Sequence, residues 1–240
     1  MTGNELSGWH VEAYGHSRNG IELRAFMPSA PGPIAGLVTA AQHGEEVDTA
    51  LLARRLLERI PGAETRWAVV PVVNPDGLLA GTRQNAAGVD LNRNFPASSW
   101  RPDPSFTFPP GIAAELRVRE HRTNHSSPGT GAGSEPETRA LVALVAELRP
   151  SLVVDLHSPL ELILVREGAD AAGDRLAEAA GLQTYRDLDG DCPGAFDDWL
   201  VEQGVPALVY EVEHAGLPEL CARHLPGLEA LMRADAPAPR

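Results

Sequence analysis

The sequence contains no lysine, and its 20 basic residues, all arginine, face 33 acidic residues, which gives a formal charge of −13 over 240 residues. Binding to nucleic acid or to an anionic membrane depends on clustered positive charge that neutralises phosphate groups. A balance this acidic therefore argues against nucleic acid and against a membrane surface as partners. It favours a small molecule or a peptide.

Long apolar runs and cysteines are also scarce. The longest apolar runs, 34–41 and 140–146, are far shorter than the roughly 18 to 20 residues that a membrane span requires. Residues 1–10 show no basic segment followed by an apolar stretch, so no secretory signal is expected. Two cysteines, Cys192 and Cys221, do not make a disulfide framework. We therefore expect a cytoplasmic protein.

Segments typical of strands alternate with segments typical of helices along the chain. Strands are expected at 9–14, 21–26, 34–40, 67–73, 151–156, 161–165 and 205–212, from alternating or continuous apolar residues. Helices are expected at 47–60, 134–148, 170–180, 193–204 and 217–233, from helical spacing and start signals. With 43% apolar residues, this order predicts one α/β domain over residues 1–240, with a mixed central β-sheet flanked by helices.

Three local features stand out between these elements. The Asn-Pro-Asp-Gly run at 74–77 has the composition of a turn. In the Ser-Glu-Pro-Glu run at 134–137, a capping box is expected, with Ser134 as the cap and Glu137 reaching back to it. Residues 78–133 have little periodicity and much Pro, Gly, Ser and Asn, which is typical of a functional loop.

Polar side chains follow the ends of three of the expected buried strands. His43 and Glu46 follow the strand at 34–40, His157 follows 151–156, and Glu211 lies at the end of the last strand. Ligands collect at the carboxyl ends of strands in open α/β sheets. Two imidazoles and one carboxylate are a set that catalytic zinc takes. Glu45 competes with Glu46 as ligand, and each residue taken alone could be an ordinary polar residue at a strand end.

Further motifs follow in a fixed order. They are Asn-Pro-Asp-Gly at 74–77, Gly-Thr-Arg at 81–83 and Gly-Val-Asp-Leu-Asn-Arg-Asn-Phe-Pro at 88–96. Together with His-Gly-Glu-Glu at 43–46, His157 and Glu211, the set resembles the zinc carboxypeptidases, or funnelins, from about residue 14 to residue 211. The resemblance implies a hydrolase that holds one zinc ion per chain on His43, Glu46 and His157.

The resemblance also implies roles for other residues. Arg83 falls where the family stabilises the oxyanion, and Asn92 with Arg93 falls where it binds the terminal carboxylate of the substrate. Glu211 matches the general base. A guanidinium binds a carboxylate through two parallel hydrogen bonds, which suits Arg93 to its position.

One loop departs from the family pattern. Many members carry a tyrosine shortly before the segment that 194–199 resembles, but this chain has Gly-Asp-Cys-Pro at 190–193, and Tyr185 is out of register. We therefore assign no catalytic tyrosine. Cys192 lies in this loop, either as a thiol near the pocket or as a small buried residue.

The substrate depends on the segment at 195–199, which lines the specificity pocket in related enzymes. Here it carries Asp197 and Asp198. If Asp197 lines the pocket, it favours a cationic group; alternatively both acids lie on an exposed helix start, where they favour the dipole. The motifs at 43–46, 134–137, 157–160 and 193–199 resemble members that cleave the γ-D-glutamyl–meso-diaminopimelate bond of murein peptides. A meso-diaminopimelate side chain ends in an ammonium beside a second carboxylate.

Three alternatives remain open at this point. The first is a metallocarboxypeptidase that releases basic C-terminal residues from ordinary peptides. The second is a deacylase of the succinylglutamate desuccinylase or aspartoacylase type, although those proteins usually lack the Asp-Gly at 76–77. The third is a binding module without zinc. The murein peptide interpretation and the first alternative predict a small peptide as the substrate.

Overall fold

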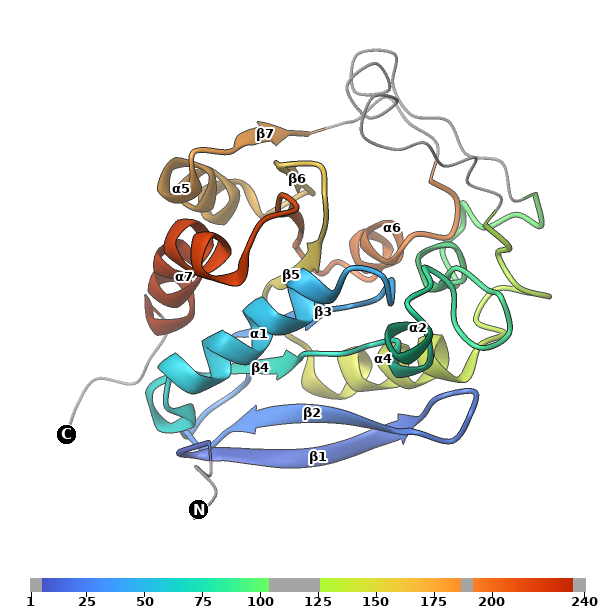
Figure 1. Cartoon of the computed structure of the whole chain (residues 1–240), viewed down its shortest axis with the longest axis horizontal. Coiled ribbons are helices and arrows are strands. Elements are labelled where there is room, and N and C mark those ends of the chain that lie inside the picture. Colours follow the sequence, from blue (N-terminus) through green and yellow to red (C-terminus); the bar gives the residue numbers. More distant parts are fainter. Residues whose placement is uncertain (1–5, 104–125, 187–191, 235–240) are drawn as a thin grey trace.

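One mixed sheet of eight strands runs through the protein (Figure 1). The computed structural model describes residues 6–103, 126–186 and 192–234. The strands lie in the order β1-β2-β4-β3-β5-β8-β6-β7. Their bounds are β1 Trp9–His16, β2 Glu22–Pro28, β3 Gly36–Ala40, β4 Trp67–Val70, β5 Val153–His157, β6 Leu162–Val165, β7 Gln183–Tyr185 and β8 Ala207–Glu211. The predicted mixed α/β sheet is confirmed.

Four parallel strands, β4, β3, β5 and β8, form the centre of the sheet. Antiparallel strands extend it on both sides, because β2 pairs with β4 and β6 pairs with β8. The predicted hairpin forms β1 and β2. All five residues of β3 and of β5 are buried, as the continuous apolar runs indicated.

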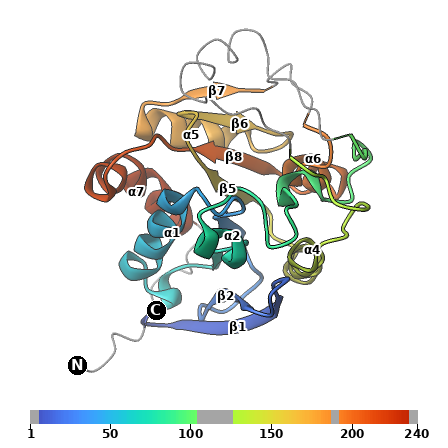
Figure 2. The same cartoon turned by 45° about the vertical axis from the view of Figure 1, so that its right-hand side comes forward.

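Helices cover both faces of the sheet (Figures 1 and 2). Their bounds are α1 Val47–Arg59, α2 Pro75–Ala80, α4 Pro136–Leu148, α5 Asp170–Ala180, α6 Phe196–Glu202 and α7 Leu217–Ala234, with 3-10 turns at Gly62–Glu64 and Leu91–Arg93. Residues of α1, α5 and α7 share one apolar core with side chains such as Val38 and Tyr210. Residues of α4 and α6 form a second core with Leu37 and Val153 on the other face. Successive side chains of the central strands point to opposite faces of the sheet and thus contribute to two apolar cores.

The predicted turn at 74–77 is more regular in the structure than expected. The run at 74–77 is the beginning of α2, not a simple turn: Asn74 is the N-cap, its Oδ1 accepts from Gly77 N at 2.9 Å, and Pro75 opens the helix. Asparagine at the cap and proline at the first position favour a helix start as well as a turn.

The predicted capping box at 134–137 is wrong. The N-cap of α4 is Glu135, and Ser134 Oγ donates to its carboxylate at 2.8 Å. Glu137 does not reach back, because its carboxylate accepts hydrogen bonds from Arg18 N and from Asn85 Nδ2. Long-range partners thus replace the local cap.

Helix α6 begins at Phe196, three residues after the predicted start at Pro193. Gly194 has a φ of +72°, a left-handed conformation that is not helical, and a Cβ there would lie 2.5 Å from Arg93 O. The short edge strand β7 was not predicted. Residues 104–125, most of the predicted long loop, lie outside the described residues.

The turn after β3 depends on a close backbone contact. A Cβ at Gly44 would lie 1.9 Å from the carbonyl carbon of Gly77, at the first turn of α2. We expect Gly44→Ala to lower the free energy of unfolding by about 1–3 kcal/mol, because the backbone must shift. Urea unfolding in the presence of a chelator measures this. Gly131→Ala is the control, since nothing lies within 4 Å of its added Cβ, and equal losses for both variants would contradict the prediction.

Candidate metal centre and substrate cleft

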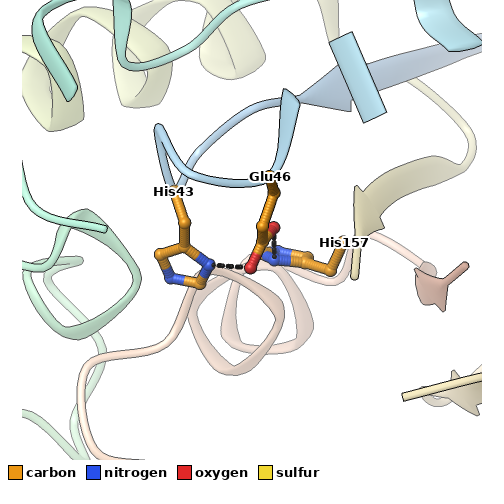
Figure 3. A group of neighbouring side chains, drawn as sticks. All are labelled: His43, Glu46 and His157. Atoms are coloured by element: carbon orange, nitrogen blue, oxygen red, sulfur yellow. Dashed lines mark hydrogen bonds and ion pairs between the residues drawn. The ribbon is translucent and has the colours of Figure 1, made fainter. Parts of the chain in front are cut away.

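Two imidazoles and one carboxylate converge at the carboxyl ends of β3 and β5 (Figure 3). Glu46 bridges them, with Oε1 2.6 Å from His43 Nδ1 and Oε2 3.0 Å from His157 Nδ1. One ligand atom from each residue lies within 4.8 Å of the others, and all three side chains are buried. Glu46, rather than Glu45, occupies the position between the imidazoles.

The sheet register explains why these residues meet. Strands β3 and β5 are parallel neighbours, with Ala40 paired to Leu156, so the turn after β3 lies beside His157. Glu46 is the N-cap residue of α1, and its backbone oxygen accepts from Thr49 Oγ1 at 2.8 Å. His157 thus ends a strand and Glu46 caps a helix, while His43 lies in the short turn between β3 and α1.

Two further carboxylates fix the imidazole rings from behind. His43 Nε2 lies 3.1 Å from Asp90 Oδ1, and His157 Nε2 lies 2.8 Å from Asp155 Oδ2. A carboxylate on Nε2 leaves Nδ1 as the ligand atom, and such outer partners orient metal-binding histidines. Two Nδ1 atoms and one carboxylate, buried and oriented in this way, fit zinc.

The charges around the rings reflect this arrangement. Burial disfavours a charged His157, but Asp155 and Glu46 raise its pKa well above the ordinary value. Burial likewise opposes the charge of Asp90, but Arg83 and His43 hold the pKa of that carboxyl well below its usual range. A bound cation would displace protons from the imidazoles.

Glu211 lies at the end of β8, opposite His157 in the register of β5 and β8. It is only 9% exposed, and its Oε2 accepts from Leu160 N at 3.2 Å. Burial raises the pKa of Glu211 to about 7, and the charge of Glu46 adds to this rise. A carboxylate with a pKa near neutrality is suited to accept and return a proton.

Arg83 lies next to the metal-binding set. Its Nε donates to Asp90 Oδ2 at 2.8 Å, and its Nη1 lies 4.0 Å from Glu46 Oε1. The same Asp90 carboxylate accepts from Asn92 N at 3.0 Å. Asp90 therefore connects a metal-binding histidine, Arg83 and the segment that carries Arg93.

Asn92 and Arg93 border the start of α6. Asn92 Oδ1 accepts from Phe196 N at 2.8 Å, so one end of its side chain holds this helix. Arg93 Nη2 lies 3.5 Å from the Sγ of Cys192. Cys192 is thus a partly buried thiol beside Arg93, which agrees with both sequence interpretations of this residue.

Asp197 is buried, so the exposed-helix interpretation is wrong for this residue. It is 7% exposed, and its Oδ2 lies 3.4 Å from Arg166 Nη1. Burial raises the pKa of Asp197, and Arg166 opposes the rise. Asp198 is more open and pairs with Arg166 Nη2 at 2.7 Å.

Tyr185 makes no hydrogen bond to this arrangement within the described residues. Tyr185 lies in the edge strand β7, where its hydroxyl donates to Gln183 Oε1 at 2.9 Å. Residues 190 and 191, in the loop whose sequence differs from the family pattern, lie outside the described residues.

Three residues of this arrangement, Asp90, Asp155 and Arg166, had no role predicted from the sequence. The signal for Asp155 was present, because residues two apart on a strand share a face and Asp155 precedes His157 by two. Asp90 lay inside the recognised run at 88–96. Arg166 had no such signal, since only the fold brings it to α6.

Comparison with known proteins identifies the class. The chain belongs to the zinc carboxypeptidase family (Peptidase_M14), which it matches over residues 7–189. It is therefore a hydrolase of a zinc-using family, and His43, Glu46 and His157 form a group that could hold the metal ion.

Individual relatives carry a more specific name. Murein peptide amidase A of Escherichia coli strain K12 is 33% identical over 223 residues, which cover 93% of this chain and 89% of the relative. The protein of the same name from Vibrio campbellii is 29% identical over 93% of this chain and 87% of the relative. The crystal structure of murein-tripeptide amidase MpaA from Escherichia coli O157 matches with a TM-score of 0.80 at 30% identity. The match covers 96% of this chain and 93% of that chain.

The fold is also similar to that of more distant solved structures. Carboxypeptidase A from Helicoverpa armigera matches with a TM-score of 0.69 at 19% identity, covering 95% of this chain and 67% of that one.

Among the helices of the described ranges, none has the length and apolar character needed to cross a membrane.

Removing the charge behind one ligand tests the metal centre. We expect Asp155→Asn to weaken zinc binding about 10–100-fold, because His157 loses its orienting carboxylate. Competition with a chromophoric chelator measures the affinity, and His157→Ala should lose the metal, measured as zinc per chain. Asp48→Asn is the matched control, since Asp48 pairs with the exposed His214 at 3.2 Å. An unchanged affinity in Asp155→Asn would contradict the assignment.

Proposed function

We propose that this chain is a zinc-dependent amidase that hydrolyses the γ-D-glutamyl–meso-diaminopimelate bond of murein peptides. The observation that carries the proposal is the buried group of His43, Glu46 and His157, with Glu211 on the adjacent strand end. The names of relatives that match nearly the whole chain support the substrate. We treat residues 1–240 as one catalytic domain that acts on a small peptide in the cytoplasm.

His43, Glu46 and His157 would hold one zinc ion per chain. Zinc in such a site supplies a Lewis acid and lowers the pKa of bound water toward about 7. The outer carboxylates Asp90 and Asp155 keep both imidazoles turned toward this position.

Glu211 acts as the general base in this proposal. Its carboxylate accepts a proton from the water that attacks the amide carbonyl and then delivers it to the leaving amine. Burial raises the pKa of this carboxyl toward neutrality, which suits both steps because the group then takes up and releases a proton more readily near neutral pH. The Leu160 N–H holds the carboxylate in place.

Arg83 and Arg93 bind the charges of the substrate. Arg83, fixed by Asp90, donates to the oxyanion that develops at the attacked carbonyl. Arg93 binds the carboxylate next to the cleaved bond, and the amide of Asn92 assists it. Asp197 binds the ammonium of the diaminopimelate side chain, which supplies a cation to a buried acid.

A second candidate follows from the same acid. Buried Asp197 also fits a metallocarboxypeptidase that releases lysine or arginine from the C-terminus of ordinary peptides. The deacylase alternative has no comparable observation in its favour.

Replacing the base separates chemistry from binding. We expect Glu211→Gln to retain zinc and product binding but to lower kcat on the order of 10²–10⁴-fold, because the amide cannot accept the proton. In the wild type, kcat/KM should fall as the pH decreases and Glu211 becomes protonated. A nearby cation favours the carboxylate, so the midpoint should lie between 4.5 and about 7. Near-normal turnover of the variant would exclude Glu211 as the base.

The substrate class is tested by product analysis. The zinc-loaded enzyme is incubated with L-Ala-γ-D-Glu-meso-diaminopimelate and, separately, with peptides that end in Lys or Arg. We expect release of diaminopimelate, detected by mass spectrometry. Release of Lys or Arg only from the ordinary peptides would favour the second candidate and overturn the first.

A further inference from the structure

Arg166 forms a bridge between two acids at the start of α6. It directly follows β6, where its N–H donates to Ala207 O at 3.0 Å. Its side chain crosses to the first turn of α6, with Nη1 3.4 Å from Asp197 Oδ2 and Nη2 2.7 Å from Asp198 Oδ1. A cation from a different part of the chain therefore stands beside the acid assigned to the substrate ammonium.

This ion cluster adjoins the residues that bind the substrate backbone. Phe196, the residue before Asp197, is held by Asn92 Oδ1, and Cys192 lies against Arg93. Asp197 also lies close enough to Asp155 for the two charges to interact. Asp155 and His157 are two residues apart on β5 and share a face of the sheet, so the cluster lies on that face.

The guanidinium of Arg166 has donors to spare. Arginine has five N–H donors. Within the part of the chain that the structure describes, Arg166 makes one hydrogen bond, to Asp198, and the looser contact to Asp197. Its side chain is 25% exposed, so it is not completely enclosed by the protein.

The two acids also differ. Asp198 is held by Arg166 and by Ser99 Oγ, which lies 3.1 Å from Oδ2. Asp197 is more deeply buried and has the longer contact to Arg166. A buried carboxylate gains most from an additional cation. The cluster therefore presents one carboxylate, of Asp197, and one guanidinium, of Arg166, side by side to a ligand.

Building on the function proposed above, we propose that Arg166 is a specificity-determining residue that binds the side-chain carboxylate of diaminopimelate while Asp197 binds the adjacent ammonium. A carboxylate and an ammonium on one carbon match a paired guanidinium and carboxylate. A lysine side chain ends in the ammonium alone. It would bind Asp197, and Arg166 would remain paired with the two aspartates. The wall of this subsite is zwitterionic, not simply acidic.

Two tripeptides that differ only in this carboxylate test the assignment. The substrates are L-Ala-γ-D-Glu-meso-diaminopimelate and L-Ala-γ-D-Glu-L-Lys, assayed with zinc-loaded enzyme. We expect Arg166→Met to lower kcat/KM for the first about 10–100-fold, mainly through KM, because a charge-assisted hydrogen bond is lost. The lysine tripeptide should change by less than about threefold, since the lost bond is absent there. Arg166→Lys should restore part of the preference, because it keeps the charge without the fork.

The control is Arg186→Met, since Arg186 also pairs with two acids, Asp170 and Asp174, but on the outer surface. It should leave the ratio of the two substrates unchanged. Equal losses on both substrates in Arg166→Met would mean that Arg166 only stabilises α6 and would overturn the inference.

A failure of the proposed function gives a different result. In that case the wild type cleaves neither tripeptide. Calorimetry then measures the binding of free meso-diaminopimelate and of free L-lysine, which tests the role of Arg166 without turnover. Wild-type binding of meso-diaminopimelate that Arg166→Met abolishes would support the inference on its own. No preference for meso-diaminopimelate over lysine in the wild type would overturn it.

Discussion

Two buried carboxylates determine the direction in which the metal-binding imidazoles point. Asp90 and Asp155 each occupy the Nε2 of one ring, so both Nδ1 atoms face the same point. A buried charge is tolerated only when it is paired and hydrogen-bonded. Each of these acids has at least one further partner, since Thr39 Oγ1 donates to Asp155 at 2.6 Å and Arg83 donates to Asp90. The orientation of the imidazoles therefore depends on these outer carboxylates and on the groups that hold them.

Asp90 also links the two halves of the proposed reaction. One oxygen supports His43 and the N–H of Asn92, and the other positions Arg83. The metal-binding group, the oxyanion donor and the segment that carries Arg93 thus share a single buried anchor. A displacement of this anchor would therefore move all three together.

The sheet supplies the remaining precision, and this part could be predicted from the sequence. The residues at the ends of buried parallel strands had to meet, because those strands end at one edge. His43, His157 and Glu211 follow that rule. The contacts of Glu137 and the start of α6 did not follow from local patterns. Partners more than 40 residues away, such as Asn85 for Glu137, and the left-handed Gly194 decided them.

The pairing of Arg166 with Asp197 shows the same limit most clearly. From the sequence, Asp197 could only be expected to form an acidic wall or to be exposed, because nothing in the spacing indicated that a cation from the end of β6 would reach it. This pairing changes the expected selectivity. A site that hydrogen-bonds a substrate group discriminates strongly against an analogue only if its own polar atoms are then left unpaired. Arg166 keeps Asp198 when the substrate carboxylate is missing. Discrimination at this subsite should therefore be moderate, and the aspartates that hold Arg166 in place also limit how much specificity it can provide.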